Sequence, residues 1–355
     1  MRKSSSLLLV LIMLLITPLA ACRSFSNGNS TPAGGTAQSS SLLNKVKERG
    51  KLLCGVSGEL PGFSYVNQQG KYSGLDVDIC RAIATAMFDD PDAVEFRNLN
   101  AKERFAALLS GEVDILSRNT TWTIKRDTSA GLEFAPTVFY DGQAMMVKKA
   151  SGITDLQDLQ NKSICVQTGT TTEQNLADQM SKLGIKYTPL VFEEVNATFA
   201  AYEQERCEGV TTDRSQLVSR RSVLPKPDQH IILEAVMSKE PLAPAVKQGD
   251  SQWFDTVKWV IYGLIEAEEL GINSQNIDQF LSSEDPVVKR FLGTEEDLGE
   301  QLGLSKDFMT QTIRKVGNYG EIYDRNLGAK TPFNLERGQN QIWAKGGLMY
   351  APPFR

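Results

Sequence analysis

Histidine is almost absent from this chain, since His230 is the only one among 355 residues. That scarcity disfavours enzymes that depend on a histidine relay or on several imidazole ligands to a metal. A block of basic charge is missing as well: Lys and Arg number 38, Asp and Glu number 43, and the formal net charge is −5. A net acidic chain without such a block is a poor binder of nucleic acid.

Long apolar runs are also missing, and the run at residues 7–16 is too short to span a membrane. Arg2 and Lys3 precede it, and a Leu-Ala-Ala-Cys sequence ending at Cys22 follows it. This order predicts a lipoprotein signal peptide at residues 1–21, with Cys22 as the lipid attachment site. The alternative is an ordinary secretory signal beside an incidental cysteine. Residues 22–41 are mainly small and polar, which predicts a flexible tether.

Export to an oxidising compartment explains the four remaining cysteines, Cys54, Cys80, Cys165 and Cys207. An even number in an oxidising compartment predicts disulfides, and none of the spacings is typical of zinc. Four cysteines allow three pairings, and the alternative is four buried thiols. The predicted strands and helices, described below, form two lobes. They favour the pairs Cys54–Cys80 and Cys165–Cys207, because each disulfide then joins two elements of the same lobe.

Strand-like and helix-like segments alternate along the chain, and the alternation restarts near residue 150. This order predicts an α/β fold with largely parallel sheets in two lobes. Apolar residues make up 41% and charged residues 23% of the chain, which is ordinary for a soluble globular protein. A long amphipathic helix is expected at residues 250–270, with further helices beyond it.

Several motifs together carry a resemblance. The segment GLDVDI at 74–79 is followed by CRAIA at 80–84. Further motifs are AKERF at 101–105, SRNTTWT at 117–123, YDGQ at 140–143, QTGTTTE at 167–173, TTD at 211–213 and SKEPL at 238–242. The sequence from residue 42 onward resembles the family 3 extracellular solute-binding proteins, the polar amino-acid receptors of ABC importers. Within that family it is similar to the general L-amino-acid-binding branch.

The resemblance implies a type II periplasmic binding protein, in which two α/β lobes are joined by a two-strand hinge. Hinges are expected near residues 143–148 and 236–244. Lobe 1 would then comprise residues 42–144 plus 240–355, with a helical C-terminal extension, and lobe 2 residues 145–239. The implied protein is monomeric, lipid-anchored in the periplasm and free of cofactors and metals. Its partners would be a free L-amino acid and the permease and cytoplasmic ATPase of an ABC transporter.

The resemblance also assigns the residues that hold the ligand's α-carboxylate. Arg126 would fork that group with two parallel N–H bonds, and Thr121 would donate beside it. Thr171 would contact the carboxylate from lobe 2. Thr170 with Glu173 fits a capping box, which suits both a structural cap and an anion site at a helix start.

The ligand ammonium would be accepted by the carboxylate of Asp213 and the backbone carbonyl of Asn119. The alternative for Asp213 is the N-cap of the following helix. Asp76 and Asp78 are spaced for a helix start rather than for a catalytic pair. Phe63 and Trp122 are candidates for the cleft or for the core. Leu60 stands where receptors for basic amino acids place an aromatic residue, which favours a neutral or broad pocket.

An enzyme on the same fold, of the dehydratase or lytic transglycosylase type, is the rival hypothesis, because fold does not settle function. The sequence offers no nucleophile-and-base arrangement, metal cluster or phosphate loop in support of it. A binding protein without catalysis is therefore the expected function.

Overall fold

The computed structural model describes residues 41–355. The predicted signal peptide, Cys22 and the tether up to residue 40 lie outside the described residues. Ser41 accepts a hydrogen bond from Leu43 N and caps helix α1 (Leu42–Arg49). No helix of the described part is long and apolar enough to cross a membrane.

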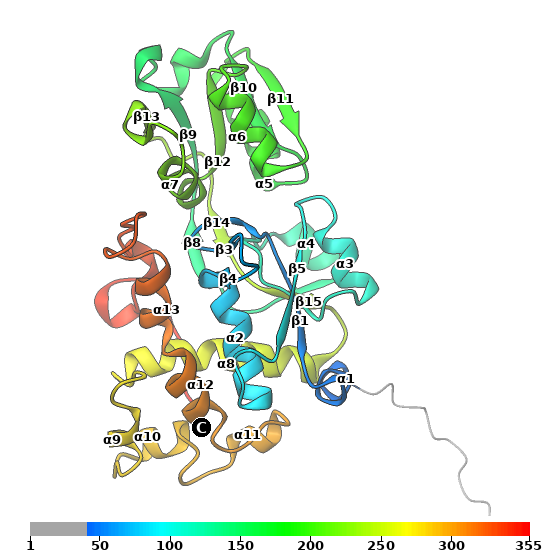
Figure 1. Cartoon of the computed structure of the whole chain (residues 1–355), viewed down its shortest axis with the longest axis vertical. Helices are drawn as coiled ribbons and strands as arrows, with labels where there is room; N and C mark the ends of the chain where they lie inside the picture. The colour runs from blue at the N-terminus through cyan, green and yellow to red at the C-terminus, as the bar shows by residue number, and fades with distance from the viewer. Residues whose placement is uncertain (1–40) are drawn as a thin grey trace, which may run out of the picture. The chain divides into compact units, whose positions relative to one another are not determined.

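The first α/β sheet has the strand order β5-β1-β6-β15-β7 (Figure 1). Strand β1 is parallel to β5 and β6, whereas β15 is antiparallel to β6 and β7. These strands are β1 (Leu52–Val56), β5 (Val94–Asn98), β6 (Ile115–Leu116), β7 (Leu132–Phe134) and β15 (Ala245–Lys247). The helices between them are α2 (Leu75–Phe88), α3 (Arg104–Ser110) and α4 (Ile124–Ser129). A smaller antiparallel sheet is built from β2 (Glu59–Leu60), β3 (Ser64–Val66) and β4 (Tyr72–Ser73).

The second sheet has the order β11-β10-β12-β9-β13. Strand β10 is parallel to β11 and β12, and β9 is antiparallel to β12 and β13. Its strands are β9 (Gln143–Lys148), β10 (Ser163–Gln167), β11 (Thr188–Phe192), β12 (Gly209–Asp213) and β13 (His230–Ile232). Its helices are α5 (Thr171–Leu183), α6 (Val195–Glu203) and α7 (Arg214–Ser222). Short 3₁₀ helices lie at Lys149–Ser151, Leu156–Leu159 and Pro227–Gln229.

Two antiparallel strands connect the sheets: β8 (Phe139–Asp141) pairs with β14 (Glu240–Leu242) (Figure 1). The chain leaves the first sheet through β8 and returns to it through β14. The first crossover therefore precedes the segment expected to form it, residues 143–148. That segment is instead strand β9, which is hydrogen-bonded on both sides within the second sheet.

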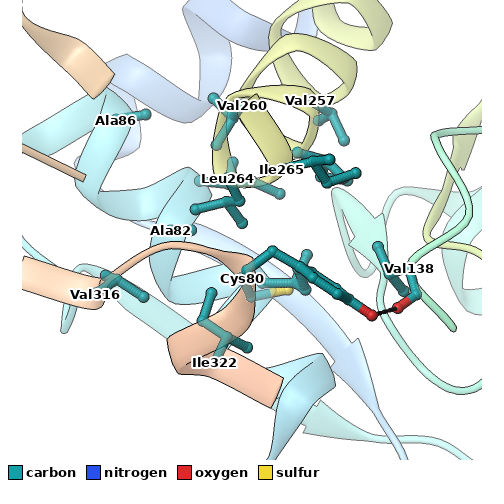
Figure 2. Packing of buried hydrophobic residues seen from close by; sticks show 14 of the residues in the cluster. Cys80, Ala82, Ala86, Val138, Val257, Val260, Leu264, Ile265, Val316 and Ile322 are labelled. Carbon is teal, nitrogen blue, oxygen red and sulfur yellow. Dashed lines mark hydrogen bonds between the residues drawn. The ribbon is translucent and has the colours of Figure 1, made fainter. Parts of the chain in front are cut away.

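The C-terminal helices extend the core of the first lobe. Figure 2 shows side chains of α2 packed against the long helix α8 (Ser251–Glu269) and against Val316 and Ile322. The Tyr319 hydroxyl donates to the Val138 carbonyl at 2.7 Å within this core. The remaining helices are α9 (Ile277–Phe280), α10 (Pro286–Phe291), α11 (Leu298–Gln301), α12 (Phe308–Val316) and α13 (Tyr319–Asn326), with 3₁₀ helices at Gly338–Asn340 and Trp343–Lys345. Because α2 is covered by both β1 and these helices, it is buried over most of its circumference.

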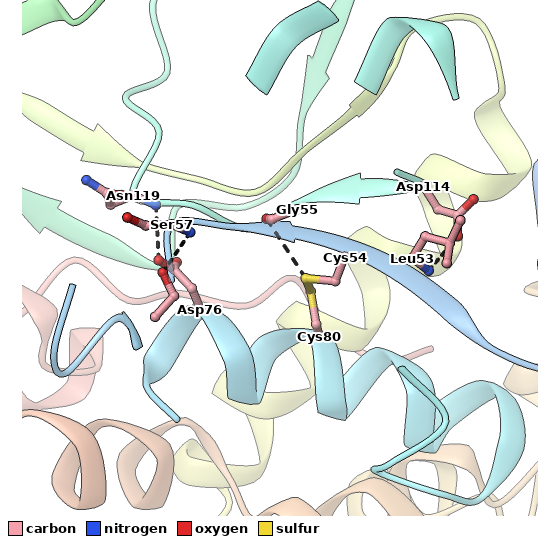
Figure 3. Close-up of a disulfide and its surroundings, with 9 residues drawn as sticks. Leu53, Cys54, Gly55, Ser57, Asp76, Cys80, Asp114 and Asn119 are labelled. Carbon is pink, nitrogen blue, oxygen red and sulfur yellow. Dashed lines mark hydrogen bonds between the residues drawn. A yellow bond between two sulfur atoms is a disulfide. The ribbon is translucent and has the colours of Figure 1, made fainter. Parts of the chain in front are cut away.

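Each lobe contains one disulfide. Cys54 on β1 is bonded to Cys80 on α2, which ties the helix to the strand that it packs against (Figure 3). Cys165 on β10 is bonded to Cys207, which lies two residues before the neighbouring strand β12. The pairing matches the one that the predicted topology favours.

His230 differs from its expected environment. Its place at the start of a strand-like segment predicts a partly exposed residue at a sheet edge, and β13 is indeed the edge strand. The side chain is nevertheless buried, at 7% exposure, because Tyr202 of α6 covers it. The Tyr202 hydroxyl lies 2.9 Å from His230 Nδ1. Burial lowers the pKa of His230, so the neutral ring is favoured.

Candidate functional site

A small, wholly polar cavity lies where the carboxyl ends of the central strands meet, and its volume is about 20 Å³. In open α/β sheets this end of the strands is where ligands bind. The lining residues come from both lobes: Ser57, Arg104, Arg118, Asn119, Thr121, Gln167, Thr170, Thr171, Thr172, Thr212, Asp213 and Gln216. We call this space the inner cavity. Five of the six predicted ligand contacts line it, and Arg126 does not.

Asp213 contributes a buried carboxylate to the inner cavity. It is 4% exposed, and its side chain makes no hydrogen bond to any described residue. It occupies the N-cap position of α7 without capping it, so the structural alternative for this residue is not used. Burial raises the pKa of Asp213 well above its usual value, and the carboxylates of Asp141 and Glu240 raise it further. Such a group suits a cationic partner.

Asn119 stands beside the start of α2 in a left-handed conformation, with φ = 30°. Its N–H donates to Asp76 Oδ2 at 3.1 Å, while its own Oδ1 is buried without a partner (Figure 3). Burial raises the pKa of Asp76 to about 6. Asp78 turns the other way and pairs with Arg81 and Arg325. The two acids therefore serve different contacts, as their spacing indicates.

Thr121 and Thr171 bring the lobes together. Their hydroxyl oxygens are 3.3 Å apart, and both donate to Glu240 Oε2. The other oxygen of Glu240 accepts from Asn175 Nδ2 at 2.7 Å and from the Ser238 hydroxyl. Glu240 is 1% exposed and lies on the crossover strand β14. This carboxylate thus binds side chains of both lobes at the hinge, although only its SKEPL context was noted from the sequence.

Thr170 caps helix α5. Its hydroxyl accepts from Glu173 N at 3.1 Å and donates to the Gln167 carbonyl at 2.7 Å. The Glu173 carboxylate accepts from Gly169 N and the Thr168 hydroxyl rather than from Thr170 N, so the reciprocal capping box is not formed. The first N–H groups of a helix have no intrahelical partner. Those of α5 open at a wall of the inner cavity and favour an anion there.

Arg126 and Arg104 stack on the same ring. Their guanidinium carbons lie 5.2 Å and 4.8 Å from the centroid of Phe105. Arg126 Nη1 donates to the Thr121 carbonyl at 2.8 Å. Arg104 Nη1 donates to the Thr120 hydroxyl at 3.2 Å, and Arg104 Nε is buried without a partner. Burial lowers the pKa of both arginines, whereas the carboxylate of Asp213 acts to raise both pKa values.

Arg118 is a further arginine of the inner cavity that sequence reasoning missed. It is 5% exposed, and its Nε donates to the Leu99 carbonyl at 2.7 Å. Burial lowers its pKa to about 10. Arg104 and Arg118 both lie in motifs that carry the family resemblance, but a local sequence gives no sign that an arginine is buried. Only the folded packing shows it.

A second cavity of about 130 Å³ adjoins the first, and we call it the outer cavity. Ser57, Arg118 and Gln167 line both spaces. The outer cavity is otherwise lined by Glu59, Asn98, Leu99, Asn100, Glu103, Glu194 and Val195. The three shared residues form the boundary between the buried polar centre and this larger space.

The two candidate aromatic residues do not line either cavity. Phe63 belongs to the core, where its ring lies 5.2 Å from that of Phe139. Trp122 is 42% exposed and stacks on Phe134 at 6.0 Å. Leu60 is also a core residue. Residues 41–355 contain no group of three or more side chains that could hold a metal ion.

Comparisons with known proteins place this geometry among binding proteins. Residues 52–276 match the model of the bacterial extracellular solute-binding proteins, family 3. The general L-amino acid-binding periplasmic protein of Rhizobium johnstonii is 50% identical over 91% of this chain and 95% of its own length. The glutamate/glutamine/aspartate/asparagine-binding protein of Rhodobacter capsulatus is 45% identical over 90% of this chain and 95% of its own length.

A solved structure is similarly close. The periplasmic binding protein of an ABC transporter from Brucella ovis, with glutathione bound, is 49% identical and superposes with a TM-score of 0.87. The match covers 89% of this chain and 99% of that one.

Proposed function

Because this chain belongs to the bacterial extracellular solute-binding proteins of family 3, we propose that it captures free L-amino acids and delivers them to an ABC permease. The family predicted from the motifs is confirmed, and so is the two-lobed type II fold. The relatives are solute-binding proteins. We propose accordingly that the ligand leaves this protein chemically unchanged.

The buried carboxylate of Asp213 carries the proposal. A buried carboxylate without a hydrogen-bonding partner is costly, and an ammonium group removes that cost. The positive charges of Arg104 and Arg126 lie near enough to Asp213 to act to lower its pKa. An amino acid offers one ammonium and one carboxylate on adjacent atoms, so a single ligand can satisfy both kinds of group.

The roles of the individual residues follow from this arrangement. Asp213 and Asn119 accept from the ligand ammonium. Arg126, the N–H of Thr121 and the first N–H groups of α5 at Thr171 donate to the α-carboxylate, because the hydroxyls of the two threonines are held by Glu240. Thr170 acts mainly by capping α5 and so keeps the N–H groups of that helix in place.

The partner and location are proposed from the family and the N-terminal sequence. The domain works outside the cytoplasmic membrane, as a family of extracellular solute-binding proteins requires. Acylation at Cys22 would anchor it through the tether of residues 22–41 beside its permease. It acts as a monomer, with residues 42–144 and 240–355 as one lobe and residues 145–239 as the other.

Calorimetric titration of the soluble domain tests the proposal. At least one free L-amino acid should bind, whereas its N-acetyl and carboxamide derivatives should not, because each lacks one of the two charges. Arg126→Ala should weaken binding at least about a hundredfold, since hydrogen bonds to charged groups contribute about 1.5–3 kcal/mol each. Arg126→Lys should be nearly as weak, because lysine cannot form the fork. Failure of every amino acid to bind, or a normal titration of Arg126→Ala, would contradict these roles.

A further inference from the structure

The geometry points to Arg118 as the residue that selects the ligand's side chain, by binding a second carboxylate at the junction of the inner and outer cavities. The preferred ligands would be amino acids whose side chain ends in a carboxylate, such as L-glutamate and L-aspartate. This inference rests on the proposed function, because it assumes that the ammonium and α-carboxylate occupy the inner cavity.

The sizes of the two cavities decide where a side chain goes. The inner cavity, at about 20 Å³, is little larger than the space one water needs. The polar groups at the ligand's α-carbon are larger than this space, so the cavity has to widen to admit them and leaves no room for a side chain beside them. The side chain has to leave through the shared boundary at Ser57, Arg118 and Gln167 into the outer cavity of about 130 Å³. It passes Arg118 on the way.

Arg118 has N–H donors at that boundary that make no hydrogen bond to the described chain. Its Nε is occupied by the Leu99 carbonyl, but no hydrogen bond joins Nη1 or Nη2 to another residue of the described chain. Within residues 41–355, no carboxylate lies within 4.0 Å of its guanidinium. Two adjacent N–H groups of one guanidinium match the two oxygens of a carboxylate. The residue is also 95% buried, so water satisfies these groups poorly.

Charged groups of both signs surround the inner cavity. Arg104, Arg118 and Arg126 are close enough for each to be affected by another's charge. The carboxylates of Asp76, Glu59 and Glu194 also act on Arg118, but none of them forms a salt bridge with it. A ligand carboxylate would therefore be the first anionic group in direct contact with the Arg118 guanidinium.

The outer cavity sets a limit on the length of that ligand. Beyond Arg118 it is lined by Glu59, Glu103 and Glu194. Two of these acids already accept hydrogen bonds from Asn100: Glu103 from its N–H at 2.8 Å and Glu194 from its Nδ2 at 2.9 Å. A short side-chain carboxylate reaches Arg118 and stops there, whereas a longer anionic chain meets these acids. A lysine ammonium would have to pass Arg118 to reach them.

A ranked titration tests the inference separately from the proposed function. L-Alanine and L-serine report on the inner cavity, and L-glutamate, L-aspartate, L-glutamine and L-lysine report on the junction. For the wild type we expect L-glutamate or L-aspartate to bind at least about tenfold more tightly than L-glutamine and L-lysine. Only the two acidic ligands can form a charge-assisted bidentate pair with Arg118. Binding of L-alanine without any acidic preference, or a preference for L-lysine, overturns the role of Arg118 and leaves the proposed function standing.

Arg118→Gln should remove the preference for L-glutamate over L-glutamine, because the side-chain carboxylate loses its guanidinium partner; the ratio of the two affinities is the measured quantity, so a general loss of affinity does not affect the test. Arg118→Lys keeps the charge and should keep part of the preference, which guards against a merely unfolded variant. The control is Arg97→Gln, which removes the same charge from an exposed position on β5 and should leave the ranking unchanged. An unaltered ranking in a folded Arg118→Gln variant would refute the assignment.

Discussion

The buried carboxylate of Asp213 lowers the stability of the ligand-free protein and favours the binding of a cation. Its raised pKa means that burial favours the protonated form when no cation is near. A raised folded-state pKa contributes stability below the unfolded-state pKa, and that stability is lost as pH rises through the folded-state pKa. At neutral pH the carboxylate therefore destabilises the ligand-free protein, and an ammonium partner compensates for this.

The raised pKa of Asp213 leads to a prediction about how ligand affinity depends on pH. The ligand ammonium binds the ionised carboxylate, so the affinity of the best amino acid should increase as pH rises above the usual titration range of an Asp carboxyl and Asp213 releases its proton. Asp213→Asn should lose at least about tenfold in affinity at neutral pH and most of this pH dependence. The same variant should melt at a higher temperature than the ligand-free wild type.

Titrations across pH and ligand-free melting curves check both statements. Asp178→Asn is a matched control, because Asp178 is an exposed acid of α5. A wild-type affinity that does not change with pH, or an Asp213→Asn variant that binds normally, would contradict the role given to this carboxylate.

At the scale of elements, strand β14 joins the hinge to the site. Glu240 accepts hydrogen bonds from Thr121 on one side and from Thr171 and Asn175 on the other. These bonds to both lobes exist together only when the lobes meet. Glu240 therefore stabilises the closed arrangement around the inner cavity.

Glu240→Gln should weaken ligand binding at least about tenfold, because an amide has one acceptor oxygen and loses the charge that strengthens each bond. The faster release of ligand should account for most of the change. Surface plasmon resonance separates the two rates. Glu234→Gln is the control, since its carboxylate is 93% exposed and pairs only with Arg214 at 3.4 Å. Unchanged dissociation in Glu240→Gln would count against the closing role of this strand.

Elements with strong local signals were predictable from the sequence. The alternating pattern predicts a helix at residues 171–183, and α5 has these bounds: Thr170 caps its start, and Gly184 follows its end in the left-handed conformation. Strand β15 is three residues long and pairs with Phe134 and Leu116, more than a hundred residues earlier. No local pattern indicates such a strand. The first crossover was misplaced for the same reason, because sheet membership depends on distant partners.

The candidate site, too, was predictable from the sequence only in part. Asn119, Thr121, Thr170, Thr171 and Asp213 were selected from motifs and line the inner cavity. Arg104 and Arg118 were missed, since an arginine is usually exposed and only tertiary packing buries these two. Glu240 was missed because its function depends on four partners from separate segments.

At the scale of the whole molecule, the structure has the lobes in contact on more than one side of the site. Lys102 pairs with Glu193 at 2.6 Å, and Asn100 donates to Glu194, both between the first lobe and the second. On another side, the Ser219 hydroxyl donates to the Pro61 carbonyl at 2.6 Å. An inner cavity of about 20 Å³ behind these contacts gives an amino acid no way in. The lobes must therefore separate before a ligand can enter.

Small-angle scattering should consequently detect closure on binding. A ligand shifts a conformational equilibrium only by its different affinity for the two states, and the contacts proposed for the ligand come from both lobes. Saturation with the best amino acid should reduce the radius of gyration of the wild type, and Asp213→Ala should bind weakly and show little change. Lys102→Ala serves as the control, because its exposed ion pair contributes at most about 1 kcal/mol and the variant should still close. A saturated wild type with an unchanged radius, or an Asp213→Ala variant that binds and compacts normally, would argue that the two lobes do not close around the ligand. The permease would then need some other feature by which to recognise the loaded protein.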